Sequence, residues 1–304
     1  MVSRRSGLGV AWMVVVGCAA PDAEPATGSD CEDCALQVAP SDFLVADRGL
    51  DRILSLSTAG EVHGVVAEAP SDEAALLDDP SAVRLGPDGS LFVACFGSNR
   101  ITRWPVDGPG ETFFHDVYLE EPVALAWYGD GLLALGNDTA NVAVITAEGA
   151  LASEFGYPDL RDGHDMALGP DGLLYVATSQ HIGHGGAIQV WDVEHEALVD
   201  VFGPPEEVGR ATGLAFGPDG ALYVADHMHG QLLRFEPPRL DRVLVSEGLA
   251  GPLGVAFGPD GRLYVADEAG IHAFDPETGE SRGPELGLGD ALVSPRSITF
   301  VDTR

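Results

Sequence analysis

The chain has 304 residues, enough for one large domain or two smaller ones with a sizeable core. It carries 48 acidic residues against 16 basic ones, a formal net charge of -32 at pH 7. A surface this acidic repels phosphate backbones and anionic lipid, which argues against nucleic-acid binding. All 16 basic residues are arginine, so Schiff-base chemistry, which needs a lysine, is excluded.

The N-terminus has the organisation of an export signal. Arg4 and Arg5 supply positive charge, and residues 7–16 form an apolar stretch that is shorter than the roughly 20 residues needed to span a bilayer. The stretch ends in VVGC, which resembles the lipobox of bacterial lipoproteins. The resemblance implies a signal peptide over residues 1–17, acylation of Cys18, and export to the bacterial cell envelope, at the outer membrane or cell surface. The alternative is an ordinary signal peptide with a chance cysteine.

Residues 18–40 form the predicted tether, which begins at the acylated cysteine. The stretch is rich in Ala, Pro, Asp and Glu and has no hydrophobic periodicity, so we expect it to be disordered. It contains Cys31 and Cys34, for which a local disulfide outside the cytoplasm is favoured over a redox or metal site. Cys95 lies far away within the repeats and is expected to be a small buried residue.

The rest of the chain repeats one short pattern. A turn ending in Asp-Gly, usually GPDG, recurs with that pair at 88–89, 130–131, 171–172, 219–220 and 260–261. A short apolar strand precedes each turn and a second one, such as LYVA at 263–266, follows it. Proline sets φ for the first corner, aspartate bonds back to the backbone, and glycine accepts positive φ. The pattern therefore predicts a β-hairpin in every unit.

Each unit holds four predicted antiparallel strands in roughly 40–45 residues, which is typical of a β-propeller blade. The segment PRSITF at 295–300 aligns with the first strand of the other units, and residues 43–56 align with the second and third. Joining the two ends completes one blade and removes an open sheet edge. The sequence predicts an all-β, six-bladed β-propeller over residues 41–304, whose first blade is closed by N- and C-terminal strands together.

The repeat resembles that of the NHL-repeat propellers. The resemblance rests on Asp47 with DRI at 51–53, on SNRI at 98–101 and on the recurring GPDGxLYVAD. The chain is also similar to the SMP-30/gluconolactonase-like and virginiamycin-B-lyase-like propellers. The resemblance covers about residues 43–302. Because these propellers include enzymes, scaffolds and sensors, it implies a fold more than an activity.

A propeller normally keeps its site on the rim where the first strands begin. Equivalent positions on that rim are Arg296, Ser81, Val123, His164, Thr212 and Leu253. The resemblance to SMP-30-like lactonases implies carboxylate and amide oxygens there around calcium, a cation that takes six to eight oxygen ligands. Only His164 and the adjacent Asp165 look like ligands in this chain, so lactonase activity is not favoured.

A second ring of mostly polar residues ends the second strand of each predicted blade. Its members are Asp47, Cys95, Asn137, Thr178, Asp226 and Asp267. Such a ring either contributes to a ligand site or bonds the local backbone where each strand turns. The local interpretation is favoured.

Histidines gather on the first rim in two adjacent blades: His164, His181, His184, His227 and His229. Converging neutral imidazoles suit zinc or another divalent metal ion, or acid–base work near neutral pH. The resemblance to virginiamycin-lyase-like propellers implies a comparable rim. We therefore predict that these histidines include the ligands of one metal site, with Asp165 or Asp226 orienting an imidazole. His164 and His227 are the candidate catalytic groups. Solvated loop histidines without a ligand are the alternative.

The sequence contains no nucleophile elbow, no phosphate-binding loop and no helix-borne zinc motif. The favoured function is an envelope-anchored module, monomeric, that binds an unknown small molecule or an envelope protein. The alternative function is a metal-assisted lyase or hydrolase that uses the histidine rim. We expect membrane contact only through the lipid anchor.

Overall fold

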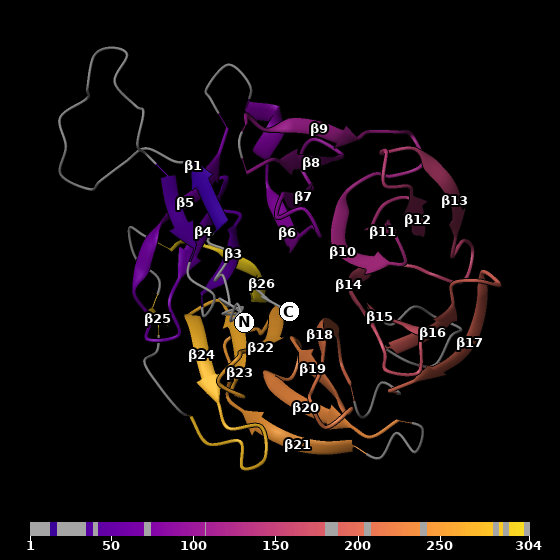
Figure 1. Ribbon diagram of the computed structural model, residues 1–304. Helices are drawn as coiled ribbons and strands as arrows, with labels where there is room; N and C mark the ends of the chain where they lie inside the picture. The colour runs from indigo at the N-terminus through magenta and orange to yellow at the C-terminus, as the bar shows by residue number, and fades with distance from the viewer. Residues whose placement is uncertain are drawn as a thin grey trace, which may run out of the picture.

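The computed structural model describes residues 13–16, 35–38, 42–69, 74–106, 108–179, 188–203, 208–237, 242–281, 286–287 and 292–300. Six four-stranded antiparallel sheets stand around a common centre as the blades of a propeller (Figure 1). The predicted six-bladed β-propeller is therefore confirmed. Within these described ranges, no helix is long and apolar enough to cross a membrane.

The strands of each blade follow one another from the centre of the ring outward. Blade 1 consists of β26 (Pro295–Phe300), β3 (Phe43–Asp47), β4 (Arg52–Leu56) and β5 (Val62–Glu68). Blade 2 consists of β6 (Pro80–Leu85), β7 (Leu91–Cys95), β8 (Arg100–Trp104) and β9 (Glu111–Phe114). Blade 3 consists of β10 (Pro122–Tyr128), β11 (Gly131–Gly136), β12 (Asn141–Ile145) and β13 (Leu151–Phe155).

The second half of the ring repeats this order. Blade 4 consists of β14 (Gly163–Leu168), β15 (Leu174–Thr178), β16 (Ile188–Asp192) and β17 (Ala197–Phe202). Blade 5 consists of β18 (Ala211–Phe216), β19 (Leu222–Asp226), β20 (Gln231–Phe235) and β21 (Arg242–Glu247). Blade 6 consists of β22 (Gly254–Phe257), β23 (Leu263–Asp267), β24 (Gly270–Phe274) and β25 (Leu286–Gly287).

Three short elements lie outside the blades. A 3-10 helix, η1 (Ala74–Leu77), precedes blade 2, and β1 (Met13–Val16) pairs antiparallel with β2 (Ala35–Val38). These two strands fall within the predicted signal peptide and tether, whereas Cys18, Cys31 and Cys34 lie outside the described residues. Cys95 is a buried free thiol, as predicted.

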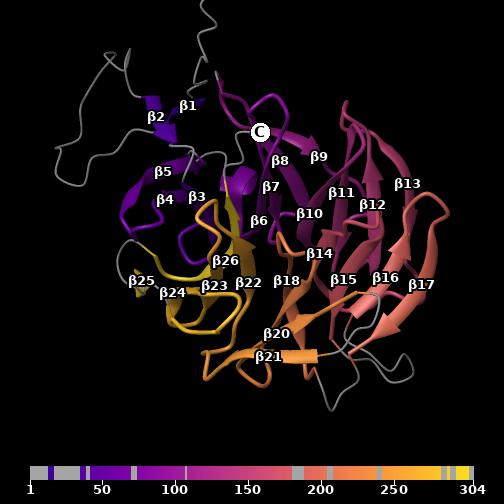
Figure 2. The same cartoon turned by 60° about the horizontal axis from the view of Figure 1, so that its bottom comes forward.

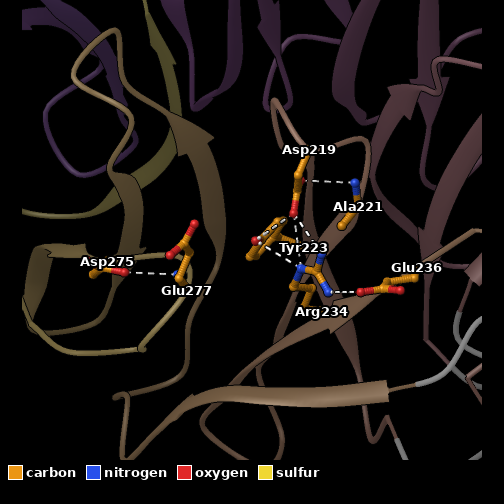
Figure 3. Close-up of polar contacts among 7 residues, drawn as sticks. All are labelled: Asp219, Ala221, Tyr223, Arg234, Glu236, Asp275 and Glu277. Carbon is orange, nitrogen blue, oxygen red and sulfur yellow. Dashed lines mark hydrogen bonds and ion pairs between the residues drawn. The ribbon is translucent and has the colours of Figure 1, made fainter.

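The Asp-Gly turn joins the first two strands of a blade by the expected mechanism. In blade 5 the Asp219 carboxylate accepts a hydrogen bond from the N–H of Ala221 at 3.1 Å, and Gly220 has a φ of 78°. The carboxylate also accepts bonds from Arg234 on β20 (2.8 Å) and from the hydroxyl of Tyr223 on β19 (3.4 Å) (Figure 3). Partial burial raises the pKa of Asp219, but the hydrogen bonds from Arg234 and Ala221 and the charge of Arg234 together lower it further than burial raises it. These hydrogen bonds connect the turn to β19 and β20.

Aromatic pairs connect successive blades. Tyr175 on the second strand of blade 4 contacts Phe216 at the end of the first strand of blade 5, with ring centroids 5.0 Å apart. Tyr264 of blade 6 makes the same contact with Phe300 of blade 1, at 5.1 Å. The tyrosine and phenylalanine therefore recur in the sequence because each packs against its counterpart in a neighbouring blade.

The two ends of the propeller domain meet in blade 1, as predicted. β26 pairs antiparallel with β3, and Ile298, which lies opposite Val45, is 4% exposed. The Asp47 carboxylate accepts hydrogen bonds from the N–H groups of Val293 and Ser294, both at 3.0 Å. Closure of the ring removes the open edge that blade 1 would otherwise present.

Deleting residues 295–304 removes β26, and we expect the Tm to fall by more than about 10 °C, because blade 1 loses its inner strand and blades 2 and 6 lose the surface packed against it. Thermal unfolding followed by circular dichroism measures this change. Removing only residues 301–304, which follow β26, is the control and should shift the Tm by less than about 2 °C. A longer deletion that melts as the control does would contradict the closure of the ring through β26.

Candidate functional site

The first strands of the blades converge at the centre of the ring (Figures 1 and 2). A small cavity of about 30 Å³ opens there. We call it the channel-mouth cavity. All six predicted rim positions line it, together with Arg84, Asp165, Arg210, Gly254, Val255, Ser297 and Ile298. The rim positions identified from the sequence therefore do lie together at one cavity.

A β-bulge at the start of the first strand aims most of these rim residues at the channel. In blade 4 the pairing register skips His164, and in blade 5 it skips Thr212. Arg296, Ser81 and Val123 are skipped in the same way in blades 1, 2 and 3. A bulge leaves its extra residue outside the ladder and redirects its side chain. Five of the six rim positions are therefore bulge residues, and Leu253 directly precedes β22.

Two of the rim positions hold neighbouring blades together. The Ser81 hydroxyl lies 2.6 Å from the carbonyl oxygen of Pro122 in the next blade, and the Thr212 hydroxyl lies 2.7 Å from that of Pro252. A hydroxyl has one proton to donate, so both groups are already used as donors. The remaining polar groups of the cavity decide what it can bind.

His164 is held in its neutral form by the groups around it. Its Nε2 accepts a hydrogen bond from the Nε–H of Arg210 at 3.3 Å and lies 2.7 Å from the hydroxyl of Ser179. Because a guanidinium only donates, Nε2 carries no proton and the ring proton is on Nδ1. Burial lowers the pKa of His164, and the charges of Arg210 and Arg296 lower it further, to about 3. His164 therefore acts as a neutral acceptor that positions Arg210.

The opposite charges of Arg84 and Asp165 partly compensate each other inside the channel. Arg84 donates to the carbonyl of Val83 (2.9 Å) and to the hydroxyl of Thr299 (2.7 Å). Asp165 accepts a bond from the N–H of Leu214 in the next blade at 2.9 Å. Burial raises the pKa of Asp165 and lowers that of Arg84, and the attraction between the two opposes both shifts. Asp165, one of the two aspartates predicted to orient an imidazole of the metal site, connects two blades through this bond.

Arg296 has no hydrogen-bond or ion-pair partner for its guanidinium in the part of the chain that the structure describes, although it lines the cavity. Burial lowers its pKa, as does repulsion by Arg48 and Arg210, while attraction to Asp79 opposes the shift. The terminal nitrogens of Arg210 likewise make no hydrogen bond to any described residue. The cavity is therefore lined by two guanidiniums whose terminal N–H groups have no acceptor among the described residues.

The aspartates that end the second strands are structural. Asp226 accepts bonds from the N–H groups of Gly209 and Arg210 at 3.0 and 3.1 Å, and Asp267 accepts one from Ala250 at 2.9 Å. Each fastens the segment that leads into the first strand of its own blade, as the aspartate of β3 does in blade 1. The local interpretation of this ring is confirmed for its aspartates.

The described histidines of the predicted metal site have different environments. Nδ1 of His229 lies 2.7 Å from the Asp226 carboxylate. Nδ1 of His227 is buried without a hydrogen-bond partner among the described residues. No group of three or more His, Cys, Asp or Glu within those residues is arranged to hold a metal ion. His181 and His184 lie outside them, so the metal site stays a prediction.

Sequence reasoning missed Arg84 and Arg210 as site residues. One signal was available, because the whole chain has only 16 basic residues and these two lie within or directly before otherwise uncharged first strands. A cation is costly to bury there without a partner. An arginine on an inner propeller strand is therefore a stronger indication of a polar channel than the surrounding acidic residues are.

Comparisons with solved structures find propellers of two of the classes that the repeat resembles. Virginiamycin B lyase from Staphylococcus aureus is 14% identical, with 81% of this chain and 82% of that chain covered and a TM-score of 0.63. A streptogramin B lyase is 15% identical, with 86% and 87% covered and a TM-score of 0.64. A chain of a nidogen/laminin complex is 16% identical, with 84% and 97% covered and a TM-score of 0.68. These identities establish the fold alone. No protein-family model and no curated protein matches the sequence.

The pKa of His164 predicts an acid-sensitive contribution to folding. It lies at about 3, below the ordinary 6.5, so the folded state favours the neutral ring and gains stability that is complete above pH 6.5. Each pH unit between 6.5 and about 3 then removes about 1.4 kcal/mol, because in this range the unfolded chain binds the proton and the folded one does not.

The variant His164→Gln lacks this titration, so its unfolding free energy should fall less steeply on acidification than that of the intact protein. Urea unfolding between about pH 7.5 and about pH 4.5 measures both slopes. His195→Gln is the control, because the His195 side chain is 71% exposed and its hydrogen bond with Asp192 raises its pKa. Parallel curves for His164→Gln and the intact protein would show that His164 is not held neutral.

Proposed function

We propose that the protein is a tethered propeller module that binds a small molecule in the channel-mouth cavity. The observation that carries this proposal is the cavity itself, with its unpaired guanidiniums at the one place where all six blades meet. The cavity is small, about 30 Å³, so it favours a small molecule or ion over an envelope protein as the ligand.

We also propose that the module is exported and anchored to a bacterial cell envelope through acylated Cys18. The support is the lipobox-like VVGC after a short apolar stretch, followed by a tether without a core of its own. Several acyl chains hold a protein firmly, since each buried CH₂ contributes about 0.8 kcal/mol.

A metal-assisted lyase or hydrolase is the second candidate. It is supported by the unpartnered Nδ1 of His227 in the described region and by the fold likeness to virginiamycin B lyase. Binding is preferred because Nε2 of His164 already accepts a bond from Arg210, which would have to be broken before that atom could bind a metal.

Leu253→Trp should block ligand binding, because an indole would fill the channel-mouth cavity that Leu253 lines. The assay is the Tm in a panel of neutral sugars, amino acids, carboxylates, phosphate esters, zinc chloride and magnesium chloride. A ligand at 100 times its Kd stabilises by about 2.7 kcal/mol, or roughly 5–10 °C for a chain of this size. We expect at least one organic class to raise the Tm of the intact protein and not that of Leu253→Trp.

Val199→Trp is the matched control, because Val199 is 54% exposed on the outer strand β17. It should respond as the intact protein does. A Tm raised equally in Leu253→Trp would place binding elsewhere, and no shift with any organic solute would contradict the proposed function. A shift with zinc or magnesium alone would favour the second candidate.

Cys18→Ser should release the protein from membranes, because serine cannot carry the thioether-linked lipid. Expression in a Gram-negative host followed by membrane fractionation and immunoblotting measures the change, with Cys34→Ser as the control. If Cys18→Ser stays in the membrane fraction as the intact protein does, the anchor lies elsewhere.

A further inference from the structure

We propose that the channel-mouth cavity holds one monovalent inorganic anion of about the size of chloride, bound by the guanidiniums of Arg210 and Arg296. The proposal goes beyond the proposed function, because such an ion would be held before any organic ligand arrives. It follows from the volume of the cavity, from the charges around it, and from the N–H groups that line it.

The volume of the cavity suits a single small ion. The cavity measures about 30 Å³. About 10–15 Å³ is enough for one water molecule, so there is room for a chloride ion and for little else. Val123, Val255 and Ile298 line the cavity but are almost fully buried, so most of the wall that faces the space is polar. A wall of this kind suits a bare ion rather than a hydrocarbon.

The charges around the cavity leave one positive charge in excess. Three arginines and one aspartate line it: Arg84, Arg210, Arg296 and Asp165. Three more charged groups act on residues of the lining: Arg48 and Asp79 on Arg296, and Asp162 on His164. Among these described residues there are four arginines and three aspartates, while His164 is neutral. One monovalent anion would balance the charges.

The potential at His164 indicates that Asp162 does not cancel the positive charge of the cavity. Burial lowers the pKa of His164 most. Arg210 and Arg296 come next, and each lowers that pKa more than Asp162 raises it. An aspartate that is outweighed by each of two arginines leaves the cavity attractive to an anion.

The potential at Arg296 leads to the same conclusion. Burial lowers its pKa most, and repulsion by Arg48 then lowers it more than attraction to Asp79 raises it. Asp79 also forms an ion pair with Arg48, so its charge is already shared. Arg84 and Asp165 attract each other and account for one charge of each sign. The excess charge therefore lies on the other two arginines of the lining.

These two arginines have N–H groups available for the ion. Arg210 bonds His164 through Nε at 3.3 Å, and its terminal nitrogens have no acceptor among the described residues. Arg296 has no acceptor among them either. His164 lies 2.7 Å from the hydroxyl of Ser179, so these two residues position the guanidinium of Arg210. A guanidinium N–H bonds strongly to an anion because both partners are charged.

An anion would also relieve a repulsion that water cannot relieve. Besides burial and Arg48, the charge of Arg210 lowers the pKa of Arg296, so the two guanidiniums repel each other in a half-buried cavity. Water would accept hydrogen bonds there but would leave both charges uncompensated. A bound anion attracts both guanidiniums, and solvent screens that attraction weakly inside a cavity. We therefore expect the folded protein, and not the unfolded chain, to bind the ion.

Thermal unfolding of the full-length protein in sodium chloride and in sodium gluconate tests the proposal. Both salts are used at about 150 mM, so that screening is equal, and gluconate is too large for the cavity. Since an ion that binds only the folded state stabilises it, we expect the Tm to be at least about 3 °C higher in chloride. Sodium bromide should act as chloride does. Equal Tm values in chloride and gluconate would overturn the proposal.

Arg210→Gln and Arg296→Gln should each lose most of this chloride effect, so that the Tm difference between the two salts falls below about 1 °C. Arg262→Gln is the control, because it makes the same charge change at the Asp-Gly turn of blade 6, outside the cavity lining. It should keep the full difference. A chloride effect of the same size in all three variants would place the ion elsewhere and overturn the proposal.

Crystals of the intact protein grown in sodium bromide locate the ion directly, and this measurement does not depend on whether a variant folds. The anomalous scattering of bromine should give a peak within hydrogen-bond distance of the terminal nitrogens of Arg210 and Arg296. Water in the cavity instead of bromide would overturn the proposal.

These results are distinct from those that test the proposed function. If chloride stabilises the intact protein through both arginines while no organic solute raises the Tm, the anion site stands and the proposed ligand binding fails. If an organic solute stabilises the intact protein but not Leu253→Trp, while chloride and gluconate act alike, the ligand binding stands and the anion site fails. Sodium chloride at equal chloride concentration is the reference for the zinc and magnesium salts of that panel.

Discussion

The six inner strands approach one another so closely around the channel that their residues cannot vary independently. A Cβ placed on Gly213 would lie 2.3 Å from the carbonyl oxygen of Leu253 in the next blade, closer than atoms can approach. At this range backbone carbonyls of one blade face the next, and the hydroxyls of Ser81 and Thr212 bond two of them. Rim residues that do not bond a neighbouring blade, Arg296 above all, are the ones available to a ligand.

The fold was predictable because its signals are local and repeated. The Asp-Gly turn depends on groups within a few residues of one another, as the bond from Ala221 to Asp219 illustrates. The closure of the ring was predictable for a related reason. Phe300 repeats the position of Phe216, so the C-terminal strand had to pack against a tyrosine of a preceding blade in the same way.

The sequence predicted where the cavity lies, but it did not predict which contacts the residues of the cavity make. The bond from Arg210 to His164 joins residues 46 apart in the chain, and that from Arg84 to Thr299 joins residues 215 apart. Such pairs depend on where bulges turn side chains, and strict alternation along a strand does not reveal bulges. Histidine was therefore given the role of a metal ligand, whereas His164 makes its described contacts as an acceptor for an arginine.

The acidic exterior and the cationic cavity act over different ranges. Exposed charges are screened within about 8 Å at physiological ionic strength, so their repulsion of an approaching small anion ends near the surface. Arg210 and Arg296 act inside a half-buried cavity, where attraction is screened much less. A small diffusible anion would spend little time near the surface carboxylates and would then be attracted by these two arginines. A polyanion or an anionic membrane stays in contact with many surface carboxylates at once. In the arrangement we propose, the net charge of -32 therefore excludes large anions from a site that attracts small ones.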